Sequence, residues 1–433
     1  MSRLAFGALW LQVFLLPCEL FLYMPEKVDF PQIGTLGRLA GLVALPLGIL
    51  EVVRRGKLRP VTKFHVWLGL FVLWSWMTVF WSFEPEATYN RAWTYLQLAA
   101  LTWLIWELAS TPDRQRALLQ AYVLGAWVAV LDTIGNFLSG TVVATGRFAA
   151  TGFGPNDLGF TLVLALPLAW YLSLIHTSKL MRWVNLLYMP LGIVGILLTA
   201  SRSSLISAFL ALSIVPWTLS RHSGSVKWGF CLLLVLSGIA IQAFIPESSW
   251  TRLASATEEF ETGSFNERDR IWQAGLQVFE RHPIAGVGAG VFGIVVQPIL
   301  GAPRAAHQTF LSVLVGQGLV GLTLFLAIFV AAFAPVRKLE PAQRAMWWVL
   351  LLTLAVGLQP RTWDYRKPLW FFLAVLAAQT SVVATSRSSR RIHAGPRNQS
   401  VWQDGDREQV ELELRGGRAV WTSAQARTGL GPI

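Results

Sequence analysis

Charged residues and cysteine are both scarce in this 433-residue sequence. Only 14% of the residues are charged, whereas soluble domains carry about 25%. Hydrophobic residues make up 54% and the mean hydropathy is +0.50, which indicates an integral membrane protein. The two cysteines, Cys18 and Cys231, both lie in apolar runs, so the sequence predicts no disulfide framework.

Several motifs that carry well-known chemistry are also missing. The sequence has no Walker P-loop and no H-E-x-x-H pair, which argues against a P-loop nucleotidase and a zincin protease. Residues 288–293 formally match G-x-G-x-x-G, but no strand is predicted before them, so they indicate a tight turn and not a dinucleotide site. Much of the net charge of +12 lies in short loops and in the tail, which favours anionic lipid headgroups over nucleic acid as the partner.

Long apolar runs account for most of the chain. Runs of roughly 17–25 residues can cross a bilayer as helices, and we predict about twelve such spans. They cover residues 5–24, 33–53, 64–82, 92–110, 117–139, 157–175, 183–200, 203–220, 228–245, 308–333, 346–360 and 368–385. The expected fold class is therefore all-α, with a polytopic transmembrane helix bundle over residues 1–385. Residues 386–433 are polar and are expected to form a disordered cytoplasmic tail.

Lysine and arginine collect in every second loop between the predicted spans. Short loops rich in these residues normally face the cytoplasm, so we place both termini on that side. The loops in question hold Arg54, Arg55, Lys57, Arg59, Lys63, Arg114, Arg116, Lys179, Arg182, Arg221, Lys227, Arg337, Lys338 and Arg344. The longest loop, 246–307, then faces the periplasm, and it contains a predicted helix over 267–281 with Asn266 as its N-cap. The first run has only Arg3 before it and no small-residue cleavage site, so we expect a retained span and not a signal peptide.

A set of arginines breaks this charge pattern, because they fall on the outer side. They are Arg147, Arg202, Arg268, Arg270 and Arg304. Fixed positive charge at that face predicts a site for an anion, and a lipid-linked phosphate is the simplest one. Arg202 stands among Ser201, Ser203 and Ser204, whose hydroxyls could help to cradle a phosphate. The alternative is that the Arg202 stem only snorkels to the headgroups.

Two further segments carry outer-side arginines. Arg268 and Trp272 are one turn apart on the predicted loop helix and share a face, which suits a sugar diphosphate. Alternating charge there is equally typical of a solvated helix face, and the choice between Arg268 and Arg270 stays open. Arg147 lies just before the sixth span, where it is expected to contact substrate, while Asn156 or Asp157 is predicted to cap the helix.

The segment that begins at His307-Gln308 enters a predicted span from the outer side. A histidine at such a helix mouth can titrate near neutral pH and serve as a general base, although it could equally be an ordinary interfacial residue. Gly318 and Gly321 follow on one face of the same span, where they would let another helix approach closely.

Together, four stretches resemble the O-antigen ligase family, which shares a domain with O-antigen and exopolysaccharide polymerases. The stretches are GRFAATGFGPNDLGF at 146–160, TASRSSL at 199–205, RDRIWQAGLQVFERHPIAGVGAGVF at 268–292 and HQTFLSVLVGQGLVG at 307–321. The resemblance implies a multi-pass glycosyltransferase of the bacterial inner membrane that uses neither nucleotide sugar nor metal. Its donor would be an undecaprenyl-diphosphate-linked glycan and its acceptor lipid A-core or a growing polysaccharide, at the periplasmic face. The essential arginine of the family corresponds to Arg202, its loop arginine to Arg268 and its histidine to His307.

The expected reaction is a single displacement at the anomeric carbon, which inverts its configuration. His307 would accept the proton of the attacking hydroxyl, with Gln308 orienting the histidine or a sugar hydroxyl. Arg202 and Arg268, with Arg270, would hold the diphosphate. No cofactor is expected. The alternatives are a polymerase of the same superfamily and, from another class, a transporter or flippase with arginines along a cavity through the bundle.

Overall fold

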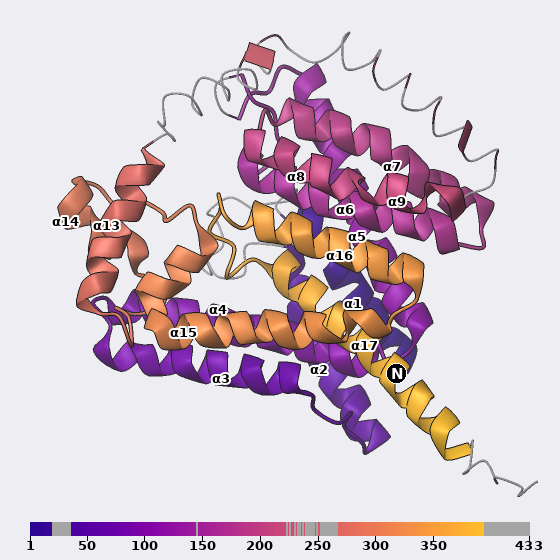
Figure 1. Ribbon diagram of the computed structural model, residues 1–433, viewed down its shortest axis with the longest axis horizontal. Coiled ribbons are helices and arrows are strands. Elements are labelled where there is room, and N and C mark those ends of the chain that lie inside the picture. The colour runs from indigo at the N-terminus through magenta and orange to yellow at the C-terminus, as the bar shows by residue number, and fades with distance from the viewer. Residues whose placement is uncertain are drawn as a thin grey trace, which may run out of the picture. The chain divides into compact units, whose positions relative to one another are not determined.

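The computed structural model describes residues 1–19, 36–143, 146–221 and 267–393, together with isolated helical positions between 224 and 251 (Figure 1). Every regular element in these residues is a helix, which confirms the all-α prediction for this part of the chain. Most of the predicted span 228–245, the predicted N-cap Asn266 and the tail beyond residue 393 lie outside the described residues.

The helices follow one another with short connections. They are α1 (Ser2–Leu15), α2 (Leu36–Arg55), α3 (Lys63–Met77), α4 (Pro85–Leu108), α5 (Pro112–Leu138), α6 (Pro155–Ile175), α7 (Lys179–Leu198), α8 (Arg202–Leu212), α9 (Ile214–Thr218), α13 (Arg268–Arg281), α14 (Phe292–Leu300), α15 (Thr309–Phe333), α16 (Pro341–Gly357) and α17 (Lys367–His393). The 3₁₀ turns η1 (Leu16–Cys18), η2 (Thr78–Trp81), η3 (Leu219–Arg221) and η4 (Ala334–Lys338) extend α1, α3, α9 and α15. Helices α4, α5, α6 and α16 begin with proline, which suits a first turn because its missing N–H would have no helical partner there.

Within the described residues, six helices are long and apolar enough to cross a membrane by length and composition. They are Leu36–Arg55, Lys63–Trp81, Pro112–Leu138, Pro155–Ile175, Lys179–Leu198 and Thr309–Lys338. Shorter apolar helices cover Ser2–Cys18 and Lys367–Val382, and the whole pattern is that of a multi-pass membrane protein. The predicted count of about twelve spans is not confirmed. The predicted span 203–220 is discontinuous, because α8 ends at Leu212 and Pro216, four residues later, cannot continue its hydrogen-bond pattern.

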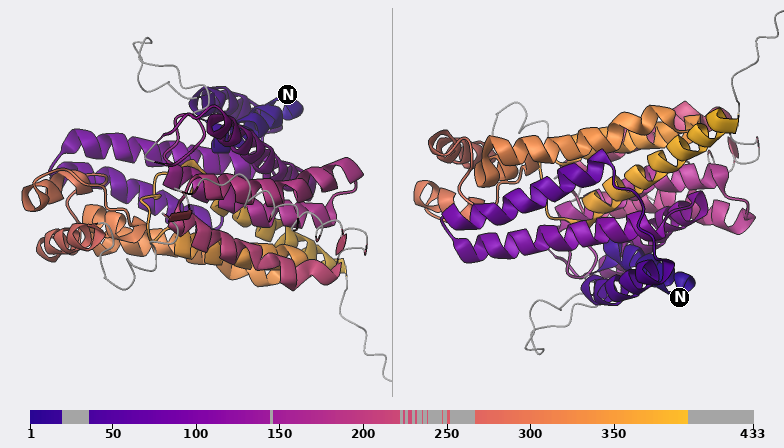
Figure 2. Two further views of the ribbon diagram at one scale, coloured as in Figure 1. Left: turned by 90° about the horizontal axis from the view of Figure 1, so that it is seen from above. Right: turned by 90° about the horizontal axis from the view of Figure 1, so that it is seen from below.

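Helices α3, α4 and α15 lie side by side, and α6, α7 and α8 pack together with α16 (Figures 1 and 2). Helix α6 is buried along nearly its whole length. Its first turn carries Asn156 and Asp157, so these polar side chains are held at the end of the core. Gly154 is the N-cap of α6, and the prediction that Asn156 or Asp157 caps it is therefore wrong.

Helix α15 is broken at Gly318, whose φ is +68°. The backbone of the preceding turn packs into this break. Leu319 N donates to Pro283 O at 2.8 Å, and Gly288 N donates to Gly316 O at 2.8 Å. A Cβ on Gly318 would lie 2.1 Å from Ile284 O. The sequence predicted that another helix would approach closely at Gly318. The close partner of Gly318 is instead the 283–290 turn.

Candidate functional site

The charged residues singled out in the sequence gather at one end of the bundle. We call this the His307 end and define it by the connecting residues 139–143, 146–154, 199–201, 301–308 and 358–366. Hydrogen bonds join these connections across the chain: Thr309 Oγ1 donates to Arg361 O at 2.6 Å, and Arg147 Nε donates to Thr199 O at 2.9 Å. Segments far apart in the sequence thus form one polar surface.

Arg361 is the centre of this hydrogen-bond network, although it is only 2% exposed. Its Nε donates to Asn156 O at 3.1 Å and its Nη1 to Gly357 O at 2.9 Å. Its Nη2 donates to Ser203 Oγ at 3.0 Å and to Ser204 Oγ at 2.7 Å. One guanidinium therefore ties the first turns of α6 and α8 to the end of α16. A buried charge of this kind is tolerated because its donors are satisfied.

Asp157 supplies the negative charge of the same surface. Its Oδ1 accepts from Trp363 Nε1 at 2.8 Å, and its Oδ2 accepts from Arg366 Nη2 at 2.7 Å. Burial lowers the pKa of Arg361 to about 9, an effect that Asp157 opposes and Arg268 reinforces. Arg361 thus stays protonated at neutral pH, and positive charge is fixed at this end of the bundle.

His307 lies at the mouth of α15 among these charges. The residue is solvent-exposed, yet partial burial of its ring lowers the pKa, as do Arg268 and Arg304, while Asp157 acts in the opposite direction. A histidine with a lowered pKa is neutral at pH 7 and is able to accept a proton. The segment just before it is anchored, since Trp272 Nε1 donates to Ala306 O at 3.0 Å.

The structure distinguishes the two loop arginines. Arg268 is the first residue of α13 and stands one turn from Trp272, and its charge lowers the pKa of both His307 and Arg361. Arg270 is exposed on another face of the helix. The N-cap of α13 is Glu267, which also pairs with Arg304 at 3.6 Å, and the predicted cap Asn266 lies outside the described residues.

Three other predicted site residues are engaged within the protein. Arg147 is 7% exposed, and its Nη2 donates to Asn156 Oδ1 at 2.6 Å. Ser201 is buried, with its Oγ 2.9 Å from Ser204 Oγ. Gln308 caps α15 by accepting from Leu311 N, and its Nε2 donates to Gln359 Oε1 at 2.9 Å. The described bonds of these residues are made with other residues of the protein.

Arg202 begins α8 and is partly exposed. It lies at the same end as His307, beside Ser203, which accepts from Arg361. The charges that act on the pKa of His307 are those of Arg268, Asp157 and Arg304.

Backbone strain marks the same positions. The non-glycine residues with positive φ in the described part of the chain are Ala200 (+45°), Glu267 (+61°) and His307 (+46°). Glu267 directly precedes Arg268, and Ala200 stands two residues before Arg202. Strained backbone of this kind persists where the surroundings enforce it, and it is concentrated at functional sites.

The sequence interpretation missed the 361–367 segment, RTWDYRK. Besides Arg361, it contributes Asp364, which is 1% exposed and whose Oδ2 accepts from Arg91 Nη1 at 3.0 Å and Tyr95 OH at 2.6 Å. A signal was present, because these cations also fall on the predicted outer side, where the charge rule disfavours them. They were overlooked because the segment was treated as a short connection between two spans.

Comparison with known proteins finds a family match in the middle and later part of the chain. Residues 187–326 match the O-antigen ligase family. The resemblance drawn from the motifs is thereby confirmed over this segment, which runs from α7 past the break in α15. It includes Arg202, Arg268 and His307, and it leaves out Arg147 and Arg361.

A relative is also found among curated proteins. The chain is 22% identical over 292 residues to the exopolysaccharide production protein ExoQ of Rhizobium meliloti (strain 1021). The alignment covers 62% of this chain and 64% of the relative, less than two thirds of either protein.

Proposed function

We propose that this protein transfers a glycan from an undecaprenyl-diphosphate-linked donor to an acceptor hydroxyl, as an O-antigen ligase-type glycosyltransferase with lipid A-core as acceptor. The family match over 187–326 supports the class of reaction. The observation that carries the site is the position of His307 beside Arg268 and Arg304, whose charges lower its pKa, with Asp157 of α6 acting in the opposite direction. A neutral imidazole beside fixed cations suits attack on a diphosphate-linked sugar.

In the proposed reaction, the acceptor oxygen attacks the anomeric carbon in line with the leaving group. The bond from that carbon to the diphosphate oxygen breaks as the new glycosidic bond forms, the configuration inverts, and undecaprenyl diphosphate leaves. His307 takes the hydroxyl proton, a role worth about 10²–10⁴ in rate. Arg202 and Arg268 hold the diphosphate and offset the charge that develops on it. The proposal requires neither a nucleotide sugar nor a metal.

The remaining predicted residues take supporting roles in this proposal. Trp272 and Arg147 are positioning residues, because they fix the backbone before His307 and the first turn of α6. Ser203 and Gln308 hold the starts of α8 and α15. We assign the loop-arginine role to Arg268 in preference to Arg270, because Arg268 is among the charges that lower the pKa of His307.

We further propose that the His307 end faces the periplasm of a bacterial inner membrane. The short connections at the opposite end, where α2 leads to α3 and α4 to α5, carry Arg54, Arg55, Lys57, Arg114 and Arg116. Clusters of this kind normally stay on the cytoplasmic side. The opposite end of each of these helices would then face outward.

A second candidate function is polymerisation of a lipid-linked polysaccharide. It is favoured by the similarity to a protein named for exopolysaccharide production. A deletion strain separates the two functions: long polymer on undecaprenyl diphosphate indicates a ligase, and single repeat units indicate a polymerase. The transporter alternative is less well supported, because the arginines gather at one end.

The decisive test uses purified full-length protein in detergent with a lipid-linked glycan donor and an acceptor lipid. We expect transfer by the wild type and a loss of about 10²–10⁴ in kcat/KM for His307→Ala, the usual contribution of a general base. His176→Ala, at the other end of α6, is the matched control and should keep full activity. Undiminished transfer by His307→Ala would reject the mechanism, and no transfer by the wild type would reject the enzymatic proposal.

A further inference from the structure

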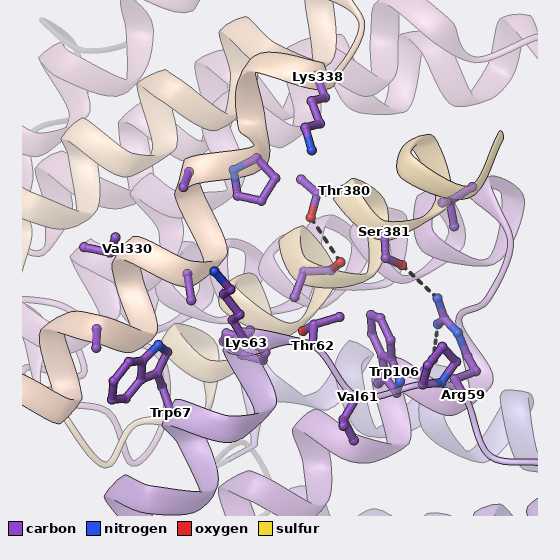
Figure 3. A pocket seen from close by; sticks show the side chains of 18 of the residues that line it. Arg59, Val61, Thr62, Lys63, Trp67, Trp106, Val330, Lys338, Thr380 and Ser381 are labelled. Carbon is purple, nitrogen blue, oxygen red and sulfur yellow. Dashed lines mark hydrogen bonds between the residues drawn. The ribbon is translucent and has the colours of Figure 1, made fainter. Parts of the chain in front are cut away.

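A cavity of about 1050 Å³ lies at the opposite end of the bundle, which we call the Met1 end. Figure 3 shows it between the start of α3, the last turns of α15 with η4, and α17. Its walls are largely apolar and include Phe64, Trp67, Leu326 and Val330. Protein pockets that bind small molecules have volumes of about 300–1,000 Å³, so this cavity is large enough for a lipid chain.

Cations from separate elements surround the cavity. Lys63 begins α3, Lys338 ends η4, and Arg59 lies in the connection before α3; Figure 3 shows the two lysines approaching from opposite sides. None of the described residues that line the cavity is acidic. The hydroxyls of Thr380 and Ser381 add hydrogen-bonding groups beside the cations.

Arg59 is held in place at this site. Its Nη2 donates to Ser381 Oγ at 2.9 Å, and its guanidinium lies 3.9 Å from the centre of the Trp106 ring. The nearby carboxylate of Glu107 pairs with Arg55 and accepts from the backbone N of Arg59 at 2.9 Å. Burial lowers the pKa of Arg59 despite the opposing effect of Glu107, so an anion at this position would be favoured.

We propose that this cavity binds one anionic glycerophospholipid from the membrane leaflet at the Met1 end. Its phosphate is held by Lys63, Lys338 and Arg59, and an acyl chain lies along the apolar wall of α3 and α15. Basic pockets between spans recognise anionic headgroups in this way, and Trp67 and Trp106 mark the headgroup level. This site is independent of the proposed transferase activity.

The test is native mass spectrometry of the delipidated full-length protein, titrated with phosphatidylglycerol or with phosphatidylethanolamine of identical acyl chains. The variant Lys63→Gln/Lys338→Gln removes two cations of the cavity. Its matched control, Lys57→Gln/Arg337→Gln, removes two exposed cations from neighbouring positions that do not line the cavity. A third variant, Ala327→Trp, fills the apolar wall and keeps every charge.

We expect one phosphatidylglycerol to bind in preference to phosphatidylethanolamine. The lysine variant should bind it roughly thirtyfold more weakly, from about 1 kcal/mol for each basic residue near a membrane surface. The control should match the wild type, and Ala327→Trp should also lose the lipid. Equal binding of both lipids by the wild type, a comparison that needs no variant, would overturn the proposal. Loss in the lysine variant but not in Ala327→Trp would overturn it too, because the headgroup would then bind outside the cavity.

Discussion

The two ends of the bundle use positive charge in different ways. At the His307 end, Arg361 and Arg147 are 2% and 7% exposed, and protein oxygens accept their hydrogen bonds. At the Met1 end, Lys63 and Lys338 are exposed beside an apolar cavity. A guanidinium has five donors in a rigid plane that a protein can satisfy, whereas an ammonium is a compact and strongly hydrated charge on a flexible stem. The buried guanidinium groups therefore hold their charge at a fixed position, whereas the exposed ammonium groups can change position.

This difference matches the two roles that we propose. Charge that stabilises a transition state works best when it is already in place, because no reorganisation is then needed during the reaction. Charge that holds a lipid headgroup can follow a mobile ligand. The predictions below test whether rigidity at the His307 end depends on Arg361, whether α15 requires its break at Gly318, and whether the fixed charge acts on His307.

Replacing Arg361 is the strongest test of the rigid end. Arg361→Met removes the guanidinium that donates to the carbonyls of Asn156 and Gly357 and to the hydroxyls of Ser203 and Ser204. Breaking a buried charged network of this kind costs about 3–5 kcal/mol. We expect a large fall in the midpoint of thermal unfolding in detergent, together with loss of transfer.

The matched control for this variant is Arg366→Met. Arg366 also lies at the His307 end, but its ion pair with Asp157 is about a third exposed on both sides. Pairs exposed to this extent contribute about 1 kcal/mol or less, so the unfolding midpoint should change little. Equal destabilisation by the two variants would contradict the assignment of Arg361 as the centre of the network.

Helix α15 runs between the two ends and is broken at Gly318. Its first half begins beside His307, and its second half lines the cavity. Gly318→Ala would place a Cβ 2.1 Å from Ile284 O at a φ of +68°. The backbone conformation and the overlap together should cost about 2–4 kcal/mol, measured as the free energy of unfolding in detergent. Gly69→Ala in α3, where a Cβ meets nothing within 4 Å, should be neutral or slightly stabilising. A stable Gly318→Ala protein would show that α15 can straighten.

The smallest expected effect concerns pH. The pKa of His307 is lowered, so its base form is lost only when the pH falls below the ordinary value of 6.5. We expect the acid limb of kcat/KM to lie below that pH. Arg304→Gln removes one of the charges that lower this pKa, and it should move the limb to higher pH. Lys57→Gln, at the Met1 end, should leave it unchanged. A limb that does not respond to Arg304→Gln would mean that His307 is not the titrating base.

The sequence predicted the positions of the helices better than their continuity. Apolar composition fixed α2, α3 and α6 close to the expected ranges, because the hydrophobic pattern is local to each segment. The breaks at Gly318 and between α8 and α9 were missed. A break at a glycine requires a partner that fills the gap, and that partner, the 283–290 turn, packs there only in the folded chain. The additional helix α14 was also missed within the long predicted loop.

The residues of the candidate site could be proposed from the sequence only in part, for a similar reason. His307, Arg202 and Arg268 were recognisable because they stand in motifs and break the charge rule. Arg361 was not recognised, although it also breaks that rule. Its importance comes from hydrogen-bond acceptors in three helices, α6, α8 and α16. Of these acceptors, only Gly357 in α16 is near Arg361 in the sequence. Likewise, the choice between Arg268 and Arg270 needed the direction of α13.

Composition and local pattern alone determined that this is a helical membrane protein, the approximate ranges of several of its helices, and which motifs were candidates for function. Folding decided which charges meet, because hydrogen bonds and electrostatic fields act over a few ångströms in space without regard to separation along the chain. The placement of Arg361 in the core, the neutral state of His307 and the cavity at the Met1 end all follow from that proximity.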